Sequence, residues 1–134
     1  PAEVGERIWP LVRAMARNAD ECGVDYLFEG DMLLPAHVVE LREILGDRLR
    51  ACFLGYRRFD PGRKVQDVRA HAGLPNDWLT EHDDAYVREV VEYGIDFSQW
   101  LEGECARAHV RYIDGSADFE RAVEAAVAHL VGAG

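Results

Sequence analysis

Two carboxylates, Glu29 and Asp31, flank Gly30 directly after the apolar run at residues 24–28. Such a run has the composition of a buried parallel strand, and Pro35 can start a helix soon after it. In open α/β sheets the ligand crevice lies at the carboxyl ends of the strands. Acidic groups placed there handle a magnesium ion, an attacking water or a substrate hydroxyl. The sequence therefore predicts Glu29 and Asp31 as catalytic residues, the alternative being a turn in which Asp31 caps the next helix.

A basic segment follows the second apolar run of the chain. Residues 56–69 hold five of the fifteen lysines and arginines, although the chain as a whole is acidic. Guanidinium groups match phosphate oxygens bidentately, and a basic flap can neutralise a phosphoryl group as charge develops. The alternative is a solvated loop whose charges pair with Asp60 and Asp67. The predicted anion-binding residues are Arg57, Arg58, Arg63, Lys64 and Arg69, of which Arg57 and Arg58 are assigned to catalysis and the others to cofactor binding. We expect the carboxylates after Phe28 and the arginines after Gly55 to converge on the same rim of the sheet.

A third candidate site, Asp114, Gly115 and Ser116, follows the last short apolar run. In this position the backbone amides and carbonyls of the three residues can lie beside a planar base, so we predict them as cofactor-binding residues. The plainer interpretation is a turn in which Ser116 caps the final helix.

Residues 55–64 superficially resemble a Walker A loop, but they do not fit its pattern. That pattern needs four residues between its glycines and a serine or threonine directly after the lysine. Here six residues separate Gly55 from Gly62, Arg63 precedes Lys64, and Val65 replaces the hydroxyl residue. The sequence therefore contains no recognisable phosphate-binding glycine loop.

The composition indicates one ordinary globular domain, spanning residues 1–134. The formal net charge of −10 argues against general binding to nucleic acid or to an anionic membrane. No apolar run approaches the roughly 20 residues that a membrane-spanning helix needs. Three widely spaced cysteines and five dispersed histidines show no metal-ligand spacing, and the cysteines indicate reduced thiols in a cytoplasmic protein.

The elements that must position these groups alternate between helices and strands. Helical periodicity is present at residues 4–19, 35–45, 64–72, 84–108 and 118–131, with Pro10 kinking or starting the first helix. The helix at residues 84–108, capped by Asp83 or Asp84, has an expected inner face of Val87, Val90, Val91, Gly94, Ser98, Leu101 and Cys105. The helix at residues 118–131 has an apolar stripe of Phe119, Ala122, Val123, Ala126, Val127 and Leu130. Short apolar runs predict strands at residues 24–28, 49–54 and 110–113. This order predicts an α/β fold, a three-layer doubly wound parallel sheet covered by helices on both faces. Because three strands make a thin sheet, we expect it to be incomplete in this chain.

Four features, in fixed order, resemble the C-terminal half of small P-loop kinases of the adenylate and shikimate kinase type. They are the helix containing Trp9-Pro10, the strand end Leu-Phe-Glu-Gly-Asp-Met-Leu-Leu-Pro, the arginine-rich flap, and Tyr-Ile-Asp-Gly-Ser-Ala-Asp-Phe at residues 112–119. The resemblance covers nearly the whole chain through loose motifs.

The resemblance implies a P-loop NTPase-like fold whose central strand and Walker A loop precede residue 1. That strand would lie between those predicted at residues 24–28 and 49–54. Glu29 and Asp31 would match the Walker B or acceptor-side position, and the basic residues of the flap would match the lid. Residues 114–116 would match the loop near the adenine. ATP and magnesium are implied as cofactors only together with the missing phosphate loop, because phosphoryl transfer depends on its amide cradle and lysine.

The leading hypothesis is a P-loop kinase-like phosphotransferase domain that acts on a small molecule with ATP and magnesium, incomplete without the upstream segment. Its partners would be a small-molecule phosphate acceptor and no nucleic acid or membrane. The alternative is a non-catalytic binding or oligomerisation module of kinase ancestry. In that case a homo-oligomer would complete the sheet across chains.

Overall fold

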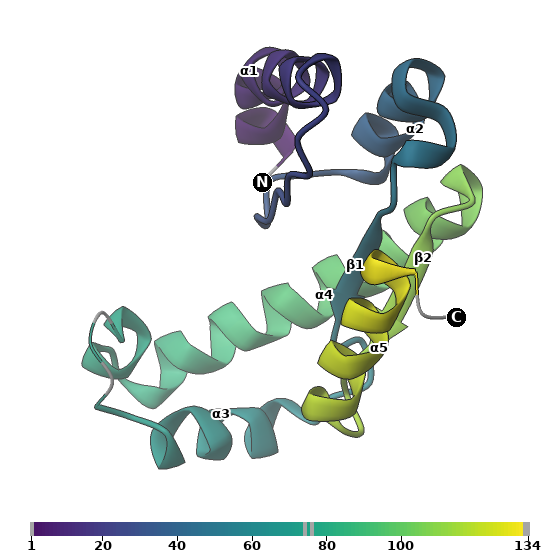
Figure 1. The fold of residues 1–134 in the computed structure, drawn as a ribbon. Coiled ribbons are helices and arrows are strands. Elements are labelled where there is room, and N and C mark those ends of the chain that lie inside the picture. The colour runs from purple at the N-terminus through teal and green to yellow at the C-terminus, as the bar shows by residue number, and fades with distance from the viewer. Residues whose placement is uncertain (1, 74, 76, 133–134) are drawn as a thin grey trace.

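A computed structural model describes residues 2–73, 75 and 77–132. The described part is mostly helical, and its sheet has two strands (Figure 1). The helices are α1 (Ala2–Glu21), α2 (Pro35–Leu45), α3 (Pro61–Ala70), α4 (Asp84–Ala108) and α5 (Phe119–Val131), with short 3₁₀ turns η1 (Gly46–Arg48) and η2 (Trp78–Glu81). The strands are β1 (Cys52–Gly55) and β2 (Arg111–Asp114). The predicted three-layer doubly wound sheet is therefore wrong.

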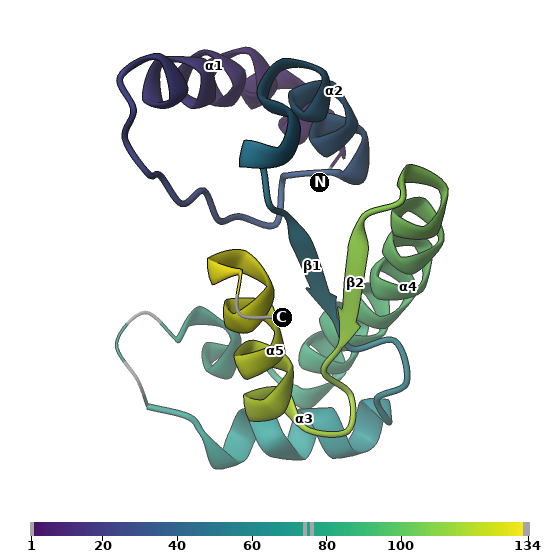
Figure 2. The same cartoon turned by 45° about the vertical axis from the view of Figure 1, so that its right-hand side comes forward.

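The two strands pair in parallel, from Cys52 beside Arg111 to Gly55 beside Asp114. Helices α4 and α5 pack on opposite faces of this pair; Figure 2 shows the green α4 behind the strands and the yellow α5 in front. Phe53 and Tyr112 pack toward α4. The described chain thus contains one parallel β–helix–β unit, with a helix on each face of the strands.

The strand predicted at residues 24–28 is absent, and this error removes a third of the expected sheet. The segment has no regular secondary structure, and no described strand lies beside it to receive its backbone hydrogen bonds. Three apolar side chains in it are largely solvent-exposed: Val24 (56%), Tyr26 (61%) and Leu27 (69%). An apolar run forms a strand only where a neighbouring strand is available to pair with it.

The helix starts follow local capping signals. Side-chain oxygens of Asp60, Asp83 and Asp118 accept backbone N–H groups from the first turns of α3, α4 and α5, respectively. Helix α1 runs through Pro10 without a break in its assignment. The predicted buried stripe of α5 is only partly confirmed. Ala122 and Ala126 are buried, whereas Phe119, Val123 and Val127 of the same stripe are exposed.

Helix α4 carries the main core. Its buried positions are Val87, Val91, Ile95, Ser98, Leu101 and Cys105, close to the inner face expected from the sequence. Towards its C-terminus, Leu101 and Cys105 pack with Val38 and Val110. Burial raises the pKa of the Cys105 thiol to about 11, so this thiol stays protonated and unreactive at neutral pH.

Helices α1 and α2 lie together at the amino end of β1, and α2 also packs on α4 (Figures 1 and 2). Trp9 is buried and stacks on His37, while its Nε1 donates to Glu40 Oε2 at 2.6 Å. The hydrogen bonds from Arg13 and then Trp9 lower the pKa of Glu40. Arg42 ties α2 to α4, because its guanidinium donates to the carbonyls at the C-terminus of α4, those of Ala108 and His109.

Candidate anion site at the carboxyl ends of the strands

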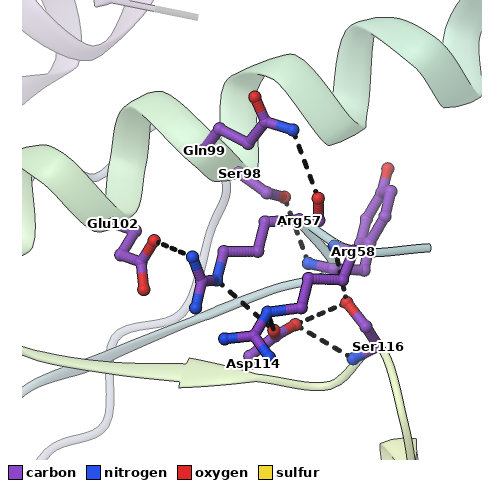
Figure 3. Close-up of polar contacts among 8 residues, drawn as sticks. Arg57, Arg58, Ser98, Gln99, Glu102, Asp114 and Ser116 are labelled. Atoms are coloured by element: carbon purple, nitrogen blue, oxygen red, sulfur yellow. Dashed lines mark hydrogen bonds and ion pairs between the residues drawn. The ribbon is translucent and has the colours of Figure 1, made fainter.

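Residues that leave β1 and β2 meet at the carboxyl ends of the two strands (Figure 3). Arg57 Nε and Arg58 Nε lie 3.4 and 3.5 Å from Asp114 Oδ2. The backbone N–H of Arg58 donates to Ser116 Oγ at 3.0 Å. Four of the residues predicted from sequence are therefore brought together. The parallel register explains this, since it ends both strands at the same edge of the sheet.

Asp114 is the anchor of this cluster. Ser116 donates to Asp114 Oδ1 through both its backbone N–H, at 3.1 Å, and its hydroxyl, at 2.5 Å. Burial alone would raise the pKa of Asp114, but the hydrogen bonds from Ser116 and the guanidinium groups of Arg57 and Arg58 outweigh burial and lower it. Asp114 is therefore an anion at neutral pH, and it fixes the turn that follows β2.

Gly115 closes the strand pair. Its backbone N–H donates to the carbonyl of Gly55 at 2.7 Å. A side chain at Gly55 would overlap the ring of Tyr112 and lie 2.9 Å from its Cζ. Burial raises the pKa of Tyr112 to about 12, so its phenol is not an acid or base near neutral pH. A backbone hydrogen bond and the close packing of the Tyr112 ring on Gly55 thus hold the turns at the strand ends.

Helix α4 supplies three polar side chains that the sequence analysis did not assign to the site. Ser98 Oγ accepts the backbone N–H of Tyr56 at 3.2 Å, and Gln99 Nε2 donates to the carbonyl of Arg57 at 3.3 Å. Glu102 Oε2 lies 2.6 Å from Arg57 Nη1. The position of Ser98 on the otherwise apolar inner face of α4 was a sequence signal for its own contact, whereas nothing in the sequence indicated the contacts of Gln99 and Glu102.

The remaining basic residues of the flap lie on α3. Arg63 is exposed. Lys64 Nζ lies over two aromatic rings, 5.5 Å from the centroid of Tyr56 and 4.9 Å from that of Phe59. The guanidinium of Arg69 donates to Asp84 Oδ1 at the start of α4 and to the backbone carbonyls at positions 80 and 82 before it. Through these contacts, Lys64 and Arg69 stabilise the local fold.

Glu29 and Asp31 are not part of this cluster. Both are exposed, and no described residue forms a hydrogen bond or ion pair with either side chain. The segment between α1 and α2 that carries them lies near the beginning of β1 (Figures 1 and 2), whereas Arg57 follows the end of β1. The predicted meeting of these carboxylates with the flap arginines is therefore not observed. Its cause is the missing strand at residues 24–28.

Neither a metal centre nor a membrane span is found in the described part of the chain. No group of three or more His, Cys, Asp or Glu side chains there is placed to hold a metal ion. No described helix is long and apolar enough to cross a membrane. Comparisons of the chain with protein-family models, with curated proteins and with solved structures gave no match.

Proposed function

We propose that this chain is part of a nucleotide-dependent phosphotransferase acting on a small molecule, and that its own contribution is a phosphate-binding site at the carboxyl ends of β1 and β2. This local arrangement and the resemblance of the sequence to small P-loop kinases support the proposal, which does not require a doubly wound sheet. We assign the protein to the cytoplasm, because its three cysteines are free, as is usual in that reducing compartment.

The observation that carries the proposal is the convergence of Arg57 and Arg58 on the turn that follows β2 (Figure 3). Two adjacent guanidinium groups offer several charged N–H donors to a phosphate. The side chain of Arg58 is 69% exposed and reaches Asp114 only at 3.5 Å, so an incoming anion can compete for it. Positive charge held at this point would stabilise the negative charge that develops in phosphoryl transfer.

ATP and magnesium are the cofactors that this proposal implies. The described residues do not fit a magnesium site of their own, because they contain no cluster of three ligands. The amide cradle and lysine for the nucleotide phosphates belong to the phosphate loop that the resemblance places before Pro1. The proposal assigns no role in phosphate binding to Glu29 or Asp31.

Replacing Arg58 by glutamine is expected to weaken pyrophosphate binding by about tenfold, the effect of losing one charge-assisted hydrogen bond. The side chain of Arg58 is mostly exposed, and its backbone N–H, which binds Ser116, is retained in the variant. The fold should therefore survive the substitution. Isothermal titration of the purified chain with pyrophosphate at fixed ionic strength measures the change.

Arg17→Gln is the matched control, because it removes the same charge from an exposed residue of α1. Its pyrophosphate affinity should stay within about twofold of the parent chain, the change left when only screened long-range charge is lost. An equal loss in both variants, or no binding by the parent chain, would contradict a phosphate site here. A longer form that includes the segment preceding Pro1 should also bind ATP with magnesium, and its failure to do so would remove the phosphotransferase proposal.

A second candidate function, a non-catalytic assembly module, is favoured by the open edge of β1. The carbonyl of Gly55 points toward β2, where it accepts from Gly115. Because alternate residues of a strand point their backbone groups to opposite edges, those of Cys52 and Leu54 face the side away from β2. No described strand occupies that side, and Leu54 is 39% exposed. An open edge of this kind is a template for pairing with a strand of another chain.

Light scattering of the purified chain tests the assembly alternative. A module that completes its sheet across chains should form a stable oligomer of defined mass and show no affinity for pyrophosphate. A monomer that binds pyrophosphate would argue against the assembly module and for the phosphotransferase.

A further inference from the structure

The guanidinium of Arg57 is held between two carboxylates that come from different elements (Figure 3). Glu102 of α4 lies 2.6 Å from Nη1, and Asp114 of β2 lies 3.4 Å from Nε. The Nε atom is buried and makes no hydrogen bond to the described residues. The short contact to Glu102 is therefore the one that fixes the guanidinium.

The two carboxylates differ in what else they bind. Asp114 accepts two hydrogen bonds from Ser116, and Arg58 also approaches it. Among the described residues, Glu102 has no hydrogen bond or ion pair besides the one to Arg57. Losing Arg57 would leave Asp114 with its other partners, whereas Glu102 would return to solvent at its partly exposed position. An incoming anion should therefore displace Glu102 from the Arg57 guanidinium more easily than it displaces Asp114.

The backbone next to Arg57 is fixed independently of its side chain. Ser98 and Gln99 of α4 bind the backbone at Tyr56 and Arg57, at 3.2 and 3.3 Å. The guanidinium can therefore exchange partners while the backbone stays in place. Glu102 lies one helical turn after Ser98, so all three contacts come from the same stretch of α4.

We infer that Glu102 is an internal substitute for the phosphate: it holds Arg57 in the site while no anion is bound and yields the Arg57 Nη1 donor when a phosphate group binds. This inference rests on the proposed phosphate site. Glu102 acts through Arg57 and does not contact the ligand, so it is a positioning residue. It keeps the partly buried guanidinium paired and ordered, and it weakens anion binding because the ligand must replace it.

The inference predicts that Glu102→Gln binds pyrophosphate more tightly than the parent chain, by about fivefold, the upper range for removal of a partly exposed competing ion pair. Glutamine keeps the size of the side chain and can still accept a hydrogen bond from Arg57, but it no longer carries the competing charge. A merely structural role would give the opposite sign, since loss of order around Arg57 would weaken binding.

Glu104→Gln is the matched control on the same helix. Glu104 is paired with Arg107, three residues away on α4, and not with the strand-end cluster. Both variants change the net charge of the protein equally, so the difference between them isolates the local effect at Arg57. We expect Glu104→Gln to change the pyrophosphate affinity by less than about twofold, because screened distant charges contribute little.

The titrations distinguish a failure of this inference from a failure of the proposed site. If the parent chain binds pyrophosphate and Arg58→Gln weakens it, but Glu102→Gln binds no more tightly than Glu104→Gln, the inference is overturned and the site remains. If no form of the chain binds pyrophosphate, both are overturned. The ¹⁵N resonance of Arg57 Nε gives a second readout, because it should shift in Glu102→Gln and on adding pyrophosphate, and not in Glu104→Gln; an unchanged signal in the first two cases would contradict the exchange of partners.

Discussion

Replacing Trp9 by alanine is expected to lower the free energy of unfolding by about 3–5 kcal/mol, the usual cost of truncating a buried tryptophan. Trp9 is only 7% exposed and packs with Ala16 and Leu41 in the layer formed by α1 and α2. Its ring stacks on His37 with centroids 4.4 Å apart and planes within 6°. The substitution removes these contacts and also the hydrogen bond to Glu40. Because α1 packs mainly on α2, we expect α1 to detach before the rest unfolds.

Trp78→Ala provides the comparison, because this tryptophan is 55% exposed and its ring makes an edge contact to the ring of His82. Its loss should cost less than about 1 kcal/mol, as for most surface substitutions. Urea unfolding followed by far-ultraviolet circular dichroism measures both variants without relying on tryptophan fluorescence, which either change would alter. Similar losses in the two variants would mean that Trp9 does not hold α1 on the protein.

Features of the fold with local determinants could be predicted from the sequence. Asp83, one of two residues expected to cap the long helix, does cap α4, whereas α5 is capped by Asp118 and not by Ser116. The inner face of α4 was predicted nearly residue by residue, because a helix of 25 residues shows its period repeatedly. Two of the three predicted strands also exist, as β1 and β2, with boundaries shifted by one to three residues.

The prediction failed where pairing between distant segments decides the outcome. Residues 24–28 have the composition of a strand, but composition cannot tell whether a neighbouring strand is present. The missing strand also affected the predicted site, because Glu29 and Asp31 were assigned to a strand end that does not form. The buried stripe expected on α5 failed similarly at Phe119, which is 69% exposed.

The residues at the strand ends also combine features that can be predicted from nearby sequence with contacts that depend on distant segments. The sequence placed Arg57, Arg58, Asp114 and Ser116 after strands, but their meeting depends on the direct pairing of β1 with β2, which was not predicted. The contribution of Glu102 was not predicted either, since it depends on how α4 crosses the strands. No spacing along the chain reports on a contact between residues 57 and 102.

Two glycines of α4 should respond in opposite ways to the same substitution. A Cβ at Gly94 would overlap the hydroxyl of Tyr56 and lie 2.8 Å from its Cζ, whereas at Gly103 the nearest atoms are the flexible end of Arg107, at 3.8 and 3.9 Å. Alanine favours a helix over glycine by about 0.5–1 kcal/mol. We therefore expect Gly103→Ala to stabilise the protein by that amount. Gly94→Ala should destabilise it by about 1–3 kcal/mol, the usual cost of overpacking.

The effect at Gly94 should extend to the phosphate site, because Tyr56 directly precedes Arg57 and its backbone N–H binds Ser98. Displacing the ring of Tyr56 from α4 shifts this backbone, so Gly94→Ala should also weaken pyrophosphate binding, while Gly103→Ala should not. In a Tyr56→Ala background the overlap is removed, and Gly94→Ala should become stabilising by about 0.5–1 kcal/mol, as at Gly103. Urea unfolding of the four variants measures this coupling. If Gly94→Ala is equally destabilising with and without the tyrosine ring, Tyr56 does not lie against α4 at Gly94, and the packing of its ring does not help to position Arg57.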